Sequence, residues 1–199
     1  GGAVFGFFGG RDWPAEADAG DADVAFYGQD QFDELGDFVV SADINGDGAD
    51  EIIATAEAAD GPDNSRELGA EVHVLYGGSD VSGVHRIADG DGDLIVWGAV
   101  APDTLGFSLA AGDLDGDGLA DVAMAAHLAS SGGVQRAGAV YILSGRDAEG
   151  REEIDLAEAP DYVAVVGGVS PADLMATSMT IAGGEPELVL GVNLADVGG

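Results

Sequence analysis

The sequence contains no cysteine and no lysine, and these two absences narrow what the protein can do. Without cysteine, the 199-residue chain has no disulfide, no thiol nucleophile and no thiolate metal ligand. All 6 basic residues are arginine, and 38 acidic residues bring the formal net charge to −32. A surface this acidic repels nucleic acid and anionic membranes, so we expect neither as a partner. No apolar run approaches the roughly 20 residues of a membrane-spanning helix, so we expect no membrane span.

The remaining composition indicates a packed, glycine-rich protein. Hydrophobic residues make up 46% of the chain, which excludes wholesale disorder, and 34 glycines argue against a mostly helical fold. So much negative charge destabilises a compact fold unless cations bind or salt screens it, the Debye length being about 3 Å at 1 M salt. The lack of lysine and the many Asp and Ala residues resemble proteins of salt-loving microbes. An ordinary acidic secreted protein is the alternative.

Two short acidic segments have the most specific pattern: DINGDGADE from Asp43 and DLDGDGLAD from Asp113. Each has oxygen-bearing side chains at its first, third, fifth and ninth positions and glycine at its sixth. Calcium takes six to eight oxygen ligands, and alternate residues of a tight loop can all point inward. The glycine permits the turn that brings in a main-chain carbonyl from position seven. The segments therefore predict two calcium sites; the alternative is a pair of Asp/Gly turns without an ion.

The two loops belong to a repeat, because they start 70 residues apart in matching surroundings. Four kinds of short segment recur in fixed order, and each is rich in β-branched or aromatic residues and bounded by Gly, Asp or Pro, as strands are. The first to fourth segments are 35–42 and 105–112, 51–56 and 121–126, 69–78 and 138–145, and 93–98 and 161–167. Partial copies lie at 1–10, 23–28, 174–183 and 187–192. Sheets of four short strands cannot bury both faces alone, so successive sheets must stack.

Leu-Gly, an aspartate-rich loop, an apolar strand and then Gly-x-Val-Tyr-x-x-x-Gly resemble the FG-GAP repeat. This repeat forms the blades of integrin alpha-subunit β-propellers and of many bacterial surface and secreted proteins. The segment from Leu105 to Gly145 is the nearest match; the one from Leu35 to Gly78 departs at Glu51, and IAGGEPE at 181–187 lacks the ligand series. The resemblance implies an all-β propeller of four-stranded antiparallel blades, with about three blade equivalents in this chain. They would occupy 1–28 (third and fourth strands), 35–98, 105–167 and 174–192 (first and second strands).

The resemblance also assigns the ligands by position. In the first loop they would be the side chains of Asp43, Asn45, Asp47 and Glu51 with the carbonyl of Ala49. In the second they would be the side chains of Asp113, Asp115, Asp117 and Asp121 with the carbonyl of Leu119. An EF-hand is excluded, because the twelfth positions are Ala54 and Met124 instead of glutamate. Because each site would join two strands, we expect the ions to be structural.

Other chemistry-bearing residues have weaker patterns. Asp89, Asp91 and Asp93 alternate before a strand, as do Asp18, Asp21 and Asp23, and both sets are more typical of turns than of a further cation site. His73, His85 and His127 lack metal-ligand spacing, and Ser108 lies at a packing position of the family. Trp97 lies in a strand, where burial against a neighbouring blade is the simpler interpretation than sugar stacking, which remains open for Trp13. No GxSxG, HExxH or Walker pattern is present.

Three blade equivalents do not close a propeller, which needs about 4–8 blades. The chain is therefore expected to be part of a longer propeller of about six or seven blades, or to form a head-to-tail homodimer. For function, we favour a non-catalytic calcium-binding module outside the cell or on its surface, used for adhesion or for protein or glycan binding. The alternatives are a propeller enzyme or accessory domain acting on polysaccharide or phosphoester, and an architectural subunit of a surface assembly.

Overall fold

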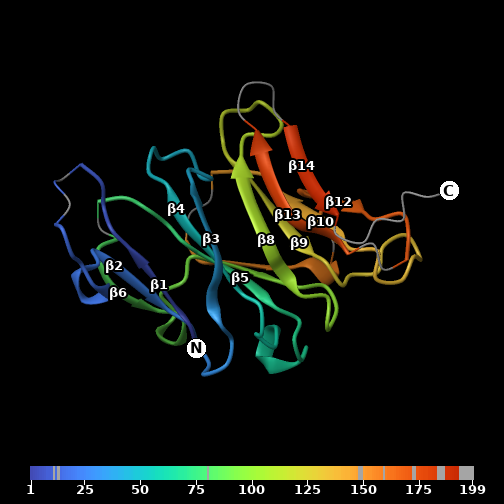
Figure 1. The fold of residues 1–199 in the computed structure, drawn as a ribbon, viewed down its shortest axis with the longest axis horizontal. Coiled ribbons are helices and arrows are strands. Elements are labelled where there is room, and N and C mark those ends of the chain that lie inside the picture. Colours follow the sequence, from blue (N-terminus) through green and yellow to red (C-terminus); the bar gives the residue numbers. More distant parts are fainter. Residues whose placement is uncertain are drawn as a thin grey trace.

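The computed structural model describes residues 1–10, 12, 14–79, 81–147, 150–158, 160–171, 174–182 and 187–192. This part of the chain is all-β: four sheets follow one another, joined by loops and short 3-10 turns, without an α-helix (Figure 1). The strands are β1 (Ala3–Gly6), β2 (Val24–Tyr27), β3 (Leu35–Ala42), β4 (Glu51–Ala56), β5 (Glu71–Leu75), β6 (Gly83–Arg86), β7 (Leu94–Trp97), β8 (Leu105–Gly112), β9 (Asp121–Ala126), β10 (Ala139–Leu143), β11 (Glu152–Asp155), β12 (Val163–Gly167), β13 (Met175–Ala182) and β14 (Glu187–Val192). The 3-10 turns are η1 (Ala19–Asp21), η2 (Pro62–Asn64), η3 (Ile87–Asp89) and η4 (Leu156–Glu158).

The expected first and second strands are present with the expected bounds, 35–42, 51–56, 105–112 and 121–126. The first sheet has the order β1-β2-β6, the second β11-β7-β5-β4-β3, the third β12-β10-β9-β8, and the fourth contains β13 and β14. In the second and third sheets, the four expected strands are antiparallel and adjacent in sequence order. The third strands pair two residues out of step with the 70-residue period, since Ile52 faces Leu75 where Val122 faces Leu143.

Each apolar layer lies between two sheets, so each inner sheet is buried on both faces. Ala54 of β4 packs toward the first sheet with Val4 and Phe26, whereas its neighbour Ile53 packs toward the third sheet with Leu105. A third layer, rich in alanine, lies between the third and fourth sheets. This explains why EIIATA and DVAMAA are apolar throughout instead of alternating with polar residues. The expectation that the sheets stack is confirmed.

The first strands of successive sheets lie next to one another, β3 beside β8 and β8 beside β13 (Figure 1). Each begins with a residue in the left-handed region followed by another: Glu34 and Gly36 flank Leu35, and Thr104 and Gly106 flank Leu105. A Cβ at Gly106 would collide with Thr55 of the second sheet, so glycine is needed for the sheets to approach this closely. The Leu-Gly pair of the repeat is thus a packing signal.

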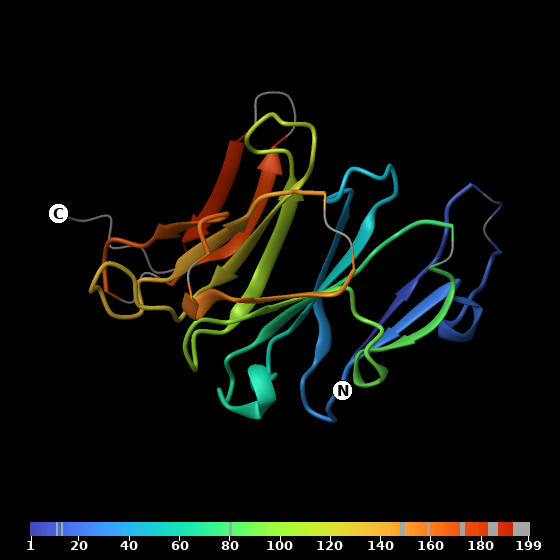
Figure 2. The same cartoon turned by 180° about the vertical axis from the view of Figure 1, so that it is seen from behind.

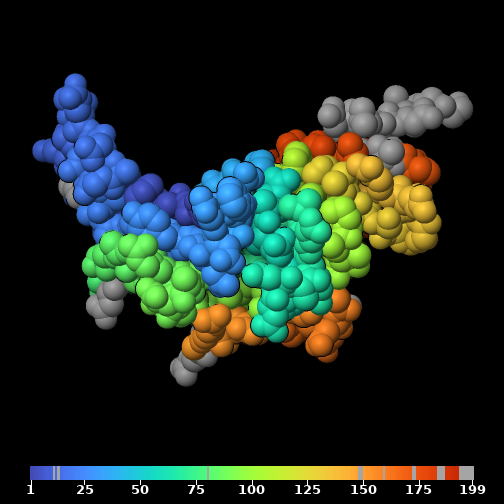
Figure 3. Space-filling model, turned by 90° about the horizontal axis from the view of Figure 1, so that it is seen from below, coloured from blue at the N-terminus to red at the C-terminus, as the bar shows by residue number. Residues whose placement is uncertain are grey.

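Two further strands, β6 and β11, were not expected from the sequence. Each lies between the third and fourth strands of its own repeat, but pairs in parallel with the outer strand of the preceding sheet: β6 with β2, and β11 with β7. Figure 2 shows the segment containing β11 crossing to the second sheet, and Figure 3 shows the region of β6 against the N-terminal segment. We call β6 and β11 the clasp strands, because each joins two neighbouring sheets.

The arginines are concentrated at these clasp strands. Arg66, in the loop after β4, donates to both carboxylate oxygens of Asp155 at the end of β11, at 2.7 and 2.5 Å, and to the carbonyl of Gly98 at 2.7 Å. Arg146 pairs with Glu152 at the start of β11, and Arg86 of β6 lies over the ring of Tyr27. The hydrogen bond from Arg66 lowers the pKa of Asp155 below its usual value.

We expect Asp155→Asn to lower the free energy of unfolding by about 1–3 kcal/mol at pH 7, because a bidentate, partly buried pair is lost. A lowered pKa in the folded state means that the stabilisation is present above the unfolded pKa of about 3.9 and is lost as pH falls through the folded value. The difference between wild type and variant, measured by urea unfolding, should therefore shrink in acid. The control is Glu153→Gln, which removes the exposed pair with Arg151 and should change stability by less than about 0.5 kcal/mol. Equal effects of the two substitutions would contradict the role of Arg66.

Candidate calcium-binding loops

The two acidic segments form matching loops, one between β3 and β4 and the other between β8 and β9. In the first loop, the carboxylate of Asp43 accepts hydrogen bonds from the backbone N–H groups of Gly46 at 2.6 Å and Gly48 at 3.0 Å. In the second, the carboxylate of Asp113 accepts from the N–H groups of Gly116 and Gly118 at 2.7 and 3.0 Å. All four glycines have positive φ, so the loop path requires residues without a Cβ.

The fifth-position aspartates extend this framework. Asp47 accepts from the N–H of Ala49 and Asp117 from the N–H of Leu119, each at 2.8 Å. The third-position side chains accept from the N–H of the fifth residue, in Asn45 at 2.9 Å and in Asp115 at 3.1 Å. These local bonds turn successive side-chain oxygens toward the inside of each loop. Such turns form wherever Asp and Asn occupy alternate positions, so they follow from the sequence.

The ninth-position carboxylates are buried and close each loop against the sheet. Glu51 accepts from the N–H of Ile44 at 2.7 Å and of Gly77, just after β5, at 3.4 Å. The carboxylate of Asp121, which is 2% exposed, accepts from the N–H groups of Leu114 and Gly145 at 2.8 and 3.0 Å. The ninth carboxylate therefore connects the loop, the second strand and the end of the third strand. This structural role was not part of the sequence interpretation.

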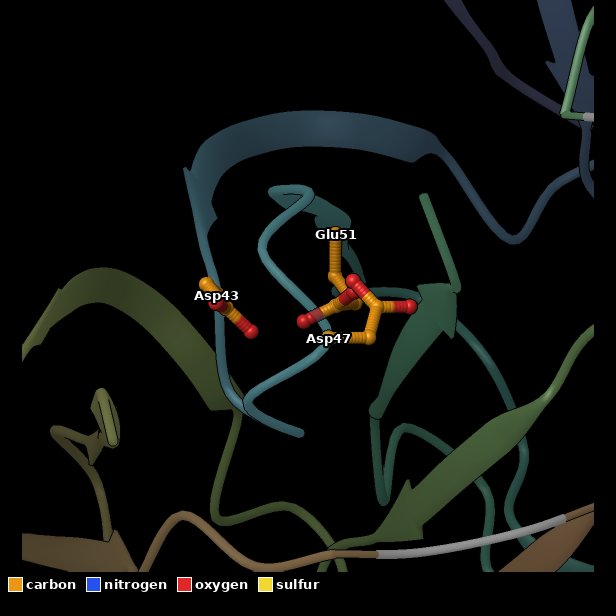
Figure 4. Close-up of side chains that lie close together, drawn as sticks. All are labelled: Asp43, Asp47 and Glu51. Atoms are coloured by element: carbon orange, nitrogen blue, oxygen red, sulfur yellow. The ribbon is translucent and has the colours of Figure 1, made fainter. Parts of the chain in front are cut away.

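The structure gathers three acidic side chains in each loop. Ligand atoms of Asp43, Asp47 and Glu51 lie within 4.8 Å of one another, and Figure 4 shows these side chains approaching from the two ends and the middle of the loop. In the second loop, the group within this distance is Asp113, Asp115 and Asp117. Asp121 is not in this group, since its shorter side chain is directed at two backbone N–H groups. The ligand roles of all these side chains, and of the Ala49 and Leu119 carbonyls, remain predictions.

Burial and neighbouring charge both act on Glu51. Loss of water around the carboxylate raises its pKa, the hydrogen bonds from Ile44 and Gly77 lower it, and repulsion from Asp47 and Asp43 raises it further. The net direction is upward, so the protein environment as a whole disfavours the negative charge of Glu51. A cation between these carboxylates would remove that penalty.

Main-chain bonds of the first loop reach the third sheet. The carbonyl of Asp43 accepts from the N–H of Ala120 at 3.0 Å, and the carbonyl of Ile44 accepts from the N–H of Arg146 at 2.9 Å. Leu119 lies so close to Gly46 that a Cβ there would approach it to 2.7 Å. An ion that orders the first loop would therefore also hold the second and third sheets together at this edge.

The fourth sheet keeps part of the loop framework. Glu187 pairs with Ala182 across β13 and β14, as Glu51 pairs with Ala42 and Asp121 with Gly112. It therefore occupies the ninth position, which the sequence interpretation did not recognise. The intervening residues 183–186 lie outside the described part of the chain.

The turn aspartates before the fourth strands act on the backbone. Asp93 accepts from the N–H of Tyr76 at 2.7 Å, Asp23 accepts from that of Phe8 at 2.8 Å, and Asp91 accepts from that of Arg86 at 2.8 Å. Asp18 and Asp21 form a reciprocal cap on η1. Among the described residues, Asp89, Asp91 and Asp93 do not form a metal-sized group, in agreement with the turn interpretation.

The remaining candidates make structural contacts. His73, buried in β5, pairs with Glu71 at 2.7 Å, and the hydroxyl of Ser108 donates to the carbonyl of Ala176 at 2.7 Å. His85 contacts the carbonyl of Val81, and His127 contacts the hydroxyl of Thr104, each at 2.7 Å. The half-buried Trp97 ends β7, and Trp13 lies outside the described residues.

Stacked sheets that repeat an aspartate-rich turn between their first and second strands define the class of protein. The model of the FG-GAP repeat matches residues 105–143, from the start of β8 to the end of β10. The resemblance is thereby confirmed: this is a protein with an FG-GAP repeat. No curated protein matches the chain.

Because both oxygens of Asp121 accept from buried N–H groups, we expect Asp121→Asn to lower stability even without calcium. The amide nitrogen of asparagine cannot accept either bond, and the expected loss is about 1.5–3 kcal/mol. Urea unfolding in the presence of a chelator measures it. Asp50→Asn, at an exposed loop position, is the matched control and should have little effect. An unchanged stability of Asp121→Asn in chelator would show that its bonds to Leu114 and Gly145 are unimportant.

Proposed function

We propose that the protein is a calcium-stabilised β-propeller module, outside the cell or on its surface, that serves adhesion or binds a protein or glycan. The observation that carries the calcium part is the matching pair of loops, in which one set of backbone hydrogen bonds directs oxygen ligands inward. The propeller part is supported by the FG-GAP match and by sheets that are buried on both faces with their first strands side by side.

The donor set fits calcium. The ligands would be Asp43, Asn45, Asp47, Glu51 and the Ala49 carbonyl in one loop, and Asp113, Asp115, Asp117, Asp121 and the Leu119 carbonyl in the other. All of these groups offer oxygen, which suits a hard cation and disfavours metals that prefer nitrogen or sulfur ligands. The ion would supply charge neutralisation inside the loop. The residues themselves would hold the turn between the first two strands and, through Asp43 and Ile44, the neighbouring sheet.

The binding surface of the module is proposed to lie at the edge opposite the calcium loops. In an antiparallel sheet, the β4–β5 and β9–β10 connections leave from the other end of the strands, and η2 lies at that end in Figure 1. A hollow of about 380 Å³ there is lined by Val100, Pro102, Asp103, Leu128 and Arg136, among others. A second, of about 290 Å³, includes Trp97, Asn64 and Arg151. These mixed apolar and polar linings suit a protein or glycan ligand.

The surroundings in which the protein works are also part of the proposal. FG-GAP repeats are typical of extracellular proteins, and the net charge of −32 is consistent with a high-salt habitat. Within the described residues, no helix is long and apolar enough to cross a membrane.

Two calcium ions should bind each chain, as measured by native mass spectrometry or by metal analysis after gel filtration. Asp117→Ala should remove one of them, lower the melting temperature in calcium and reduce the difference that a chelator makes. A site filled at one hundred times its Kd contributes about 2.7 kcal/mol, so the loss should be readily measurable. Asp89→Ala, at an exposed turn position, is the control and should retain both ions. A wild type that binds no calcium, or a chelator effect unchanged by Asp117→Ala, would refute the proposed site.

Calcium-dependent binding on a glycan array would test the interaction role. Trp97→Ala should weaken binding at least about tenfold if this ring stacks on a sugar, while the melting temperature in calcium falls only slightly. Binding that requires calcium but is unaffected by changes in either hollow would move the interaction surface elsewhere. Hydrolysis of a polysaccharide or phosphoester that is lost on mutating one carboxylate would favour the enzymatic alternative, and ordered polymers at high salt would favour an architectural role.

A further inference from the structure

The two clasp strands are placed in the same way in their repeats. Gly83, the first residue of β6, donates its N–H to the carbonyl of Asp23 at 2.8 Å, just before β2. Glu152, the first residue of β11, donates to the carbonyl of Asp93 at 2.7 Å, just before β7. Each clasp strand runs directly into a 3-10 turn, η3 or η4. The junction between neighbouring sheets is therefore a repeated, specific strand pairing.

The third sheet presents an acceptor without a clasp strand. Its outer strand, β12, pairs only with β10 among the described residues. Val166 of β12 is 41% exposed, whereas Val96, which holds the same place in β7 and pairs with Ile154 of β11, is 1% exposed. An open strand edge with exposed valines is a site for strand addition.

The first repeat contains a donor without an acceptor. Residues 15–18 (AEAD) run directly into η1, as β6 runs into η3 and β11 into η4. They are exposed and take part in no strand pairing. Asp23 nevertheless holds the N–H of Phe8 at 2.8 Å, as Asp93 holds that of Tyr76, so the surrounding loop has the same construction as in the second sheet.

The same two ends of the chain carry a second complementary pair of edges. In the second and third sheets, the third strand lies between the second and fourth strands. In the described residues, β14, a second strand, has only β13 as a neighbour, and β1, a third strand, has only β2. The edge that β14 lacks is therefore of the kind that β1 offers.

We propose that a second copy of this chain joins these edges. Residues 15–18 of one copy would lie parallel to β12 of the other, with the N–H of Ala15 donating to the carbonyl of Val163, and β1 would pair antiparallel with β14. One chain carries both halves of the junction, and three repeats per chain make six sheets in two chains, within the range of about 4–8 blades that closes a propeller. A two-fold axis then makes both junctions identical.

This inference rests on the propeller arrangement proposed above, but it is separable from calcium binding. A chain that binds two calcium ions and stays monomeric would refute the inference alone. The approaching surfaces are acidic, so association needs screening, and the measurements belong in calcium with about 1 M KCl.

The mass of the whole chain in solution tests the proposal. Sedimentation equilibrium should show a concentration-dependent species of twice the 19.8 kDa of one chain. Ala17→Pro should raise the dimer dissociation constant at least about tenfold, because strand alternation directs the N–H of Ala17, like that of Ala15, at β12. Glu16→Pro is the matched control, since its N–H points away from β12 and its loss should leave the dimer intact.

A substitution on the other side of the junction tests the same contact. Val166→Asp should be tolerated by the single chain, where Val166 is exposed, but should also raise the dissociation constant at least about tenfold by burying a charge under residues 15–18. Val84→Asp, at a 58% exposed valine of β6, is its control, and circular dichroism verifies the fold of each variant. A monomer at all concentrations, open polymers, or a dimer insensitive to both Ala17→Pro and Val166→Asp would overturn the proposal.

Discussion

The small size of its sheets is the constraint on which the rest of this structure depends. A four-stranded sheet with strands of four to eight residues cannot bury its faces by itself, so each sheet packs against the next through an apolar layer. The sheets approach closely because small residues, such as Gly106 and Ala176, occupy the start of the first strands. The close approach leaves no room for water between the sheets, and it makes their relative position critical.

Two kinds of polar contact set that position. At one edge, the acidic loops bond to the next sheet through the main chain of Asp43 and Ile44. On the outside, the clasp strands extend each sheet with a segment from its neighbour. In a chain with six basic residues, three arginines pair with acidic residues of the β11 strand: Arg66, Arg146 and Arg151. The scarce positive charge is therefore concentrated where sheets are joined.

The strands and loops could be predicted because their causes are local. The 35–42 and 51–56 segments have β-branched residues between Gly and Asp boundaries, and Asp43 and Asp113 are followed by the glycines that their carboxylates hold. The clasp strands could not be predicted in this way. EEID of β11 is mostly polar and has no β pattern, and its partner Leu94 is far away in sequence. The role of Asp121 was also hidden, because the two N–H groups that it binds become neighbours only when β8, β9 and β10 pair.

By itself, the sequence determined the repeat, the strand order within each sheet and the two oxygen-rich loops. Periodic composition and short-range hydrogen bonds specify these features without reference to distant residues. Tertiary structure decided which segments join the sheets, which carboxylates support the backbone instead of converging with the others, and which edges are left open. These features depend on pairing between residues of different repeats, and the free energy of such pairing arises only when the sheets pack.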